Sequence, residues 1–163
     1  MLAIVIILLA VIADQITKYL ALTLLNPIHR FVLIDGILEF RFVRNRGAAW
    51  GILADNRWVF MTISVISLIF LSAYLFHIRK ESKLYTVPIA LIIGGGIGNM
   101  IDRVLLGYVI DFIDFCAFPN LWKWVFNIAD SCVCVGTFML SLWLIVDTVK
   151  AYKLEKAKKE REE

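Results

Sequence analysis

Long apolar stretches alternate with short polar patches along the chain, and four of these stretches are near the length of a membrane-spanning helix. A helix needs roughly 20 residues to cross about 30 Å of hydrocarbon. The pattern predicts one helix in each of residues 1–25, 58–78, 85–106 and 126–149. An even number of spans places both ends of the chain on the same side, including the charged tail at 150–163.

The longest segment between two spans, residues 26–57, has the pattern of a β-hairpin. Asp35 and Gly36 favour a tight turn between two β-rich runs within residues 31–43, and the second run alternates apolar and polar side chains. We expect this hairpin to lie half-buried at the bilayer surface, with a plain packed loop as the alternative. The predicted fold is an all-α membrane protein with four transmembrane helices and a small extracytoplasmic β-hairpin or cradle, in a single domain over residues 1–163.

Composition and charge agree with a membrane environment. Hydrophobic residues make up 61% and charged residues 19%, and the mean hydropathy is +0.81. A nucleic-acid partner is not expected, because the net charge is only +3 and the sequence has no basic face with interleaved aromatic residues. Cations cluster in residues 79–83 and in the tail, and the positive-inside rule places both in the cytoplasm. Five arginines in residues 26–57 run against this bias, and we interpret them as site or headgroup residues.

Polar residues within the spans gather near one depth, towards the outer ends of the helices. A charge inside a span is costly enough to indicate a functional site. These residues are Asp14, Thr17 and Lys18 in the first span, Asn99, Asp102 and Arg103 in the third, and Asn127, Asp130 and Ser131 in the fourth. Asp111 and Asp114 follow directly after the third span and bring further carboxylates to this depth.

Neighbouring carboxylates can act as an acid–base pair. Two carboxylates within hydrogen-bonding range do not both ionise easily, so one keeps a proton while the other can deprotonate a water, as in aspartic proteases. Spacing alone leaves three alternatives open, namely a protease, a bundle that relays protons for transport, and a scaffold with structural ion pairs. No metal or cofactor is expected, because His29 and His77 are far apart and the three cysteines lack the spacing of a zinc site.

Five segments of the chain resemble, in order, the motif blocks of signal peptidase II, the bacterial lipoprotein signal peptidase family. They are DQITK at 14–18, RNRGAAWG at 44–51, GNMIDR at 98–103, VIDF at 109–112 and FNIADS at 126–131. Together they extend over nearly the whole chain. Five ordered blocks are far more specific than any one of them.

The resemblance implies an intramembrane aspartyl endopeptidase that removes signal peptides from diacylglyceryl-modified bacterial prolipoproteins, cutting on the N-terminal side of the lipidated cysteine. It also implies a multi-pass protein of the bacterial cytoplasmic (inner) membrane, with both termini in the cytoplasm and the active site near the extracytoplasmic face. The expected partners are the lipidated prolipoprotein substrate and membrane lipid, and the protein is expected to act as a monomer without a cofactor.

Site residues follow from the matched blocks. The resemblance implies that Asp111 and Asp130 are the catalytic pair. It implies substrate-binding or supporting roles for Asp14, Lys18, Asn45, Gly47, Asn99, Arg103, Asn127 and Ala129. Asp102 lies in a matched block but is not a catalytic aspartate there, and we expect it to pair with Arg103 or Lys18.

Overall fold

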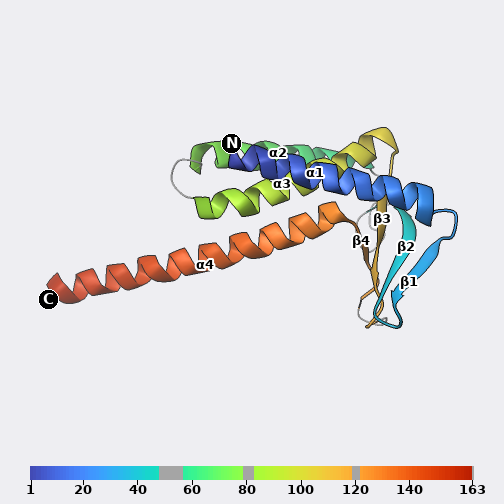
Figure 1. Ribbon diagram of the computed structural model, residues 1–163. Helices are drawn as coiled ribbons and strands as arrows, with labels where there is room; N and C mark the ends of the chain where they lie inside the picture. Colours follow the sequence, from blue (N-terminus) through green and yellow to red (C-terminus); the bar gives the residue numbers. More distant parts are fainter. Residues whose placement is uncertain (48–56, 79–82, 119–121, 163) are drawn as a thin grey trace.

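The computed structural model describes residues 1–47, 57–78, 83–118 and 122–162, and within them the chain forms four α-helices and a small sheet (Figure 1). A single π-helical turn, η1 (Ala21–Leu25), continues the first helix. The helices are α1 (Leu2–Leu20), α2 (Arg57–Ile78), α3 (Lys83–Leu105) and α4 (Ile128–Glu162). Unlike the predicted fourth span, α4 runs on through the charged tail, where residues such as Ala, Lys and Glu favour a helix.

Three helices in the described part of the chain are long and apolar enough to cross a membrane. They are Leu2–Leu25, Leu84–Leu105 and Ile128–Arg161, while Met61–His77 in α2 is a shorter apolar helix. Large apolar side chains such as Phe70 and Phe138 remain exposed on the outside of the bundle. An apolar exterior of this extent is suited to lipid. The chain is therefore a mostly helical membrane protein with a small antiparallel sheet.

The helix α3 is central and packs against α1, α2 and α4. Small residues allow the closest of these approaches. A Cβ at Gly95 would overlap the carbonyl oxygen of Ala129 and stand 2.8 Å from Cγ2 of Val133. The glycine therefore brings the first turn of α4 directly against α3, where Asp130 can reach the polar face of that helix.

The sheet has four antiparallel strands in the order β1-β2-β3-β4. The strands are β1 (Arg30–Ile34), β2 (Leu38–Asn45), β3 (Val109–Phe115) and β4 (Val125–Phe126). The first two form a hairpin around the predicted turn, where Gly36 adopts a left-handed φ of 67°. The sheet is larger than this hairpin, because β3 pairs with β2 and sets Asp111 opposite Val43.

The alternation predicted for β2 holds only in part. Glu39, expected on the polar side, is 6% exposed, because β3 pairs alongside it and Arg30 forms an ion pair with its carboxylate at 2.6 Å. In contrast, every residue of β1 is exposed, although four of the five are apolar. Below the sheet, Ala21 and Leu25 pack with Ile110 and Phe112 and attach β3 to the end of the first helix.

Candidate functional site

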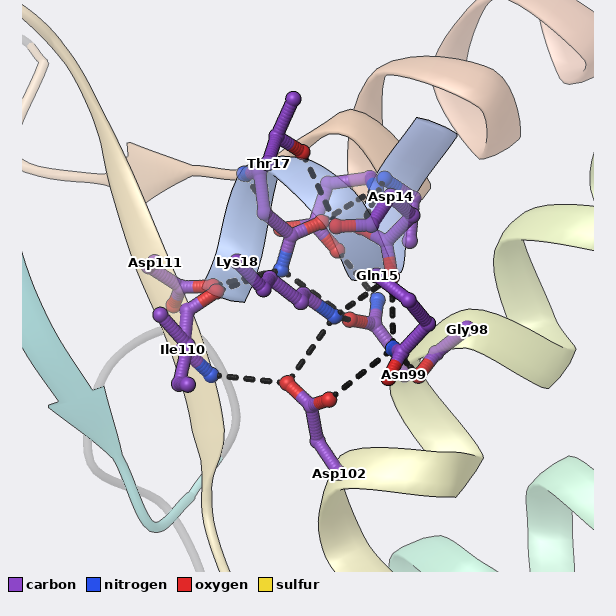
Figure 2. A network of polar contacts seen from close by, with 12 residues as sticks. Asp14, Gln15, Thr17, Lys18, Gly98, Asn99, Asp102, Ile110 and Asp111 are labelled. Atoms are coloured by element: carbon purple, nitrogen blue, oxygen red, sulfur yellow. Dashed lines mark hydrogen bonds and ion pairs between the residues drawn. The ribbon is translucent and has the colours of Figure 1, made fainter. Parts of the chain in front are cut away.

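Polar side chains from α1, β2, α3, β3 and the start of α4 meet at the end of the bundle that adjoins the sheet, and Figure 2 shows the part centred on Lys18. The hydrogen bonds and ion pairs described next connect residues from all five elements. Each residue expected at the site lies in the described part of the chain. Residues 48–51 of the second motif lie outside it.

Asp111 projects from β3 and is only 2% exposed. Its Oδ1 accepts a hydrogen bond from Nδ2 of Asn127 at 2.7 Å, and its Oδ2 accepts one from Nδ2 of Asn45 at 2.9 Å. Burial, followed by the negative charge of Asp130, raises the pKa of Asp111 to about 7, although the two amide hydrogen bonds lower it. This carboxyl group can therefore hold or release a proton near neutral pH.

Asp130 lies in the first turn of α4 and forms a reciprocal cap with Asn127. The backbone N–H of Asp130 donates to Oδ1 of Asn127 at 2.8 Å, and the backbone N–H of Asn127 donates to Oδ2 of Asp130 at 3.3 Å. The other carboxylate oxygen accepts a hydrogen bond from Nδ2 of Asn99 at 2.7 Å. The N-terminus of a helix also stabilises a negative charge. Asn127 thus contacts both aspartates, and Asp111 and Asp130 therefore lie on either side of the same asparagine.

Figure 2 shows a buried ion cluster formed by Asp14, Lys18 and Asp102. Nζ of Lys18 is 2.9 Å from Oδ2 of Asp14 and 3.0 Å from Oδ2 of Asp102, and it donates to Oδ1 of Asn99 at 2.9 Å. The lysine is 2% exposed, and both aspartates are equally well buried. Asp102 therefore pairs with Lys18, one of its two expected partners.

The cluster also holds the backbone on both sides of the site. Oδ1 of Asp14 accepts the N–H of Ala129 at 2.8 Å, which explains how Ala129 contributes through its main chain. Oδ2 of Asp102 accepts the N–H of Ile110 at 3.0 Å, next to Asp111 in β3. One end of the cluster thus holds the start of α4 and the other holds β3.

A cavity of about 560 Å³ opens beside Asp130. Its lining includes Asn45, Gly47 and Arg103 together with apolar side chains such as Leu68 of α2 and Val133 of α4. The N–H of Gly47 donates to Oδ1 of Asn45 at 3.0 Å and so fixes that amide. A mixed lining of this kind can accommodate a ligand that has both polar and apolar parts.

Gln15 is a site residue that sequence reasoning missed. Its Nε2 donates to Oδ2 of Asp14, to Oδ1 of Asp102 and to the carbonyl of Gly98, at 3.1 to 3.2 Å. Gln15 lies within the first motif, at 14–18. A single amide side chain in an apolar helix does not indicate which residues it will contact.

Asp114, in contrast, belongs to a separate cluster at the sheet. Its carboxylate pairs with Arg41 at 2.8 Å, while Glu39 pairs with Arg30. Ligand atoms of Glu39, Asp114 and Cys116 lie within 4.8 Å of one another, a spacing that could hold a metal ion. Because an arginine already neutralises each carboxylate, we interpret this cluster as an ion-pair network.

The fold and the site define a helical membrane protein with a buried cluster of carboxylates and carboxamides at one end of its bundle. A family model described as signal peptidase (SPase) II matches residues 6–146. The chain belongs to the signal peptidase II family, and its members are proteases.

Similar proteins agree with this assignment. The lipoprotein signal peptidase of Caldanaerobacter subterraneus subsp. tengcongensis is 45% identical over 88% of this chain and 95% of its own length. The lipoprotein signal peptidase of Clostridioides difficile is 39% identical over 89% of this chain and 95% of its own length. A solved structure described as a bacterial membrane enzyme, determined in meso at 2.3 Å resolution, has a TM-score of 0.78 and 37% identity, covering 90% of this chain and 88% of its own.

Proposed function

We propose that this protein is an aspartyl endopeptidase that removes signal peptides from diacylglyceryl-modified prolipoproteins, with Asp111 and Asp130 as its catalytic pair. The observation that carries the proposal is the contact of both carboxylates with Asn127, which joins the buried Asp111 and the partly buried Asp130 in one electrostatic unit. The relatives named lipoprotein signal peptidase support the substrate class. In this family the cut falls on the N-terminal side of the lipidated cysteine.

The two aspartates have different surroundings, and this suggests different roles. Asp111 holds the proton, because its pKa is raised to about 7. Asp130 is the ionised base at the start of α4, where the helix N-terminus and the amide of Asn99 stabilise its negative charge.

The reaction then follows the chemistry of paired carboxyl groups. Asp130 accepts a proton from a water molecule, whose oxygen forms a bond to the scissile carbonyl carbon. Asp111 gives its proton to the carbonyl oxygen, and a tetrahedral diol results. When the C–N bond breaks, the proton on Asp130 passes to the departing cysteine nitrogen, and the hydroxyl proton returns to Asp111 as the carboxylic acid forms.

The cavity beside Asp130 is the proposed substrate site. Asn45 and Arg103 line this cavity and are placed to donate hydrogen bonds to the substrate backbone or to the ester groups of the lipid. Arg103 lies close enough to both catalytic aspartates to interact with their charges. Apolar side chains of the lining, such as Leu68 and Leu71, suit the acyl chains, which can remain in the bilayer as the substrate enters sideways.

The proposed topology has four spans, with α2 as the one not counted among the three long apolar helices. At 1.5 Å per residue, the 22 residues of α2 extend about 33 Å, enough to cross the hydrocarbon. The cations at 79–83 and in the tail favour a cytoplasmic location for both termini. The sheet and the aspartates then lie at the extracytoplasmic face of the bacterial cytoplasmic membrane, in contact with lipid, and the protein acts as a monomer.

Cleavage of a synthetic diacylglyceryl-modified peptide by the purified protein in detergent tests the proposal. Asp111→Asn and Asp130→Asn should each abolish cleavage, and the double variant should be no worse than either, because members of one catalytic unit are not additive. Asp114→Asn is the matched control and should keep substantial activity. EDTA should leave turnover intact. A folded Asp111→Asn variant with near-parental turnover would refute the proposed pair, and loss restored by zinc would indicate another class of enzyme.

A further inference from the structure

Three carboxamides donate N–H groups to the two proposed catalytic aspartates, and each has its own oxygen held by a separate donor. The oxygen of Asn45 accepts the N–H of Gly47, and that of Asn127 accepts the N–H of Asp130. The oxygen of Asn99 accepts the ammonium of Lys18 at 2.9 Å and also an N–H of the Asn127 side chain at 3.0 Å. Two of the three amides are therefore oriented by the backbone, and Asn99 by a buried charge together with a neighbouring amide.

This difference matters because the two ends of a carboxamide have nearly the same shape and opposite hydrogen-bonding character. A rotated Asn99 would turn its NH₂ group towards the ammonium of Lys18 and its oxygen towards the carboxylate of Asp130. Both contacts would be repulsive. Lys18 is suited to prevent this, since an ammonium has three donors and no acceptor. All three donors have a partner here, in Asp14, Asp102 and Asn99.

We propose that Lys18 is a positioning residue of the protease, whose ammonium fixes Asn99 with its N–H towards Asp130. This inference rests on the proposed catalytic role of Asp130. Lys18 is shielded from water, and its shortest hydrogen-bonded link to Asp130 passes through Asn99, by the 2.9 Å contact to Asn99 and the 2.7 Å contact from Asn99 to Asp130. A purely structural lysine would serve only to neutralise Asp14 and Asp102.

Charge-matched variants separate the two roles. The buried cluster of Asp14, Lys18 and Asp102 has a formal charge of −1 + 1 − 1 = −1. Lys18→Met alone would leave two buried carboxylates unneutralised and could fail to fold for that reason. Lys18→Met/Asp102→Asn keeps the charge at −1 and removes the ammonium. The side-chain oxygen of the new asparagine can still accept the N–H of Ile110.

The experiment measures Tm, kcat and KM for cleavage of a diacylglyceryl-modified peptide and compares Lys18→Met/Asp102→Asn with the parent protein, whose cluster has the same charge of −1. Asp102→Asn alone is measured in parallel. We expect similar Tm values, a kcat lower by roughly 10- to 100-fold and a KM changed by less than about 3-fold. In an Asn99→Ala background the same removal of the ammonium should change kcat by less than about 3-fold, because the residue through which Lys18 acts is gone.

An unchanged kcat, or an equal loss of kcat with and without Asn99, would overturn the proposal. If the first pair fails to fold, Lys18→Met/Asp14→Asn provides a second variant of the same charge. Failure of both pairs to fold would assign Lys18 a structural role and also overturn it. Asp130→Asn is measured in parallel, and if that variant keeps parental activity, the proposed catalytic pair itself is wrong, whatever Lys18 does.

Discussion

Asp111→Asn should make the protein more stable at neutral and alkaline pH while it removes activity. The folded protein raises the pKa of this carboxyl group from its ordinary value of 3.8 to about 7. Between these two values the folded state keeps a proton that the unfolded chain has released. The free energy of unfolding therefore falls by about 1.4 kcal/mol for each pH unit from about 4 to 7, or about 4 kcal/mol in all, and levels off above that.

The substitution removes this titration, so the two proteins should differ in the pH dependence of their stability. From pH 5 to 8 the free energy of unfolding of the parent should fall by about 3 kcal/mol more than that of Asp111→Asn. For a chain of this size, this difference corresponds to roughly 6 to 12 °C in Tm. The new amide places an NH₂ group where Asn45 and Asn127 both donate, and this offsets part of the gain in absolute stability at every pH.

Thermal unfolding in detergent micelles at pH 5, 6, 7 and 8 provides the measurement. Asp35→Asn, in the exposed hairpin turn, serves as the control for removal of a carboxylate as such and should follow the parent. Parallel curves of Tm against pH for the parent and Asp111→Asn would refute the reasoning, because they would show that burial does not raise the pKa of Asp111.

Two further predictions concern the amide at the cavity and the contact between α3 and α4. Asn45→Ala removes the hydrogen bond to Oδ2 of Asp111 and should lower kcat about 10-fold or more while Tm changes little; proportionate losses of both would indicate a packing role. Gly95→Ala should lower the free energy of unfolding by about 1 to 3 kcal/mol, because the added Cβ would meet the backbone of Ala129. Gly96→Ala is the control and should lower it less, because its Cβ would meet only the flexible end of Leu68. Equal losses in thermal unfolding would contradict this account.

The sequence predicted the helices and the first hairpin, because both depend on the local pattern of apolar and turn-forming residues. Hydropathy located the helices to within a few residues, except for the end of α4, which continues to Glu162 through the charged tail. The Asp35-Gly36 turn located the first hairpin. The strand β3 was not predicted, because residues 109–115 are mostly apolar and follow a span, and their pairing partners in β2 lie 64 to 77 residues earlier in the chain. Such pairing leaves no local signal.

The same limit applies to the site. The positions of Asn99 and Asp130 within their predicted spans indicated that both lie near one depth, and in the structure they form a hydrogen bond. Spacing could not separate Asp111 from Asp114, which lie three residues apart in a strand that had not been predicted. The pairing of β3 with β2 separates them, since Asp111 contacts Asn45 and Asp114 pairs with Arg41. Resemblance to a family distinguished the two where spacing alone did not.

The hydrogen bond from the N–H of Ala129 to Asp14 has a consequence for biosynthesis, because 115 residues separate its two ends. At translation rates of about 5 to 20 residues per second, roughly 6 to 23 seconds pass between synthesis of the two positions. During that interval α1 enters the membrane without α4. Asp14 and Lys18 lie one helical turn apart and pair at 2.9 Å, so each can neutralise the other within the nascent helix. The newborn chain thus carries these charges into the bilayer already paired, and the polar cluster is complete only when α4 supplies Ala129 and Asp130.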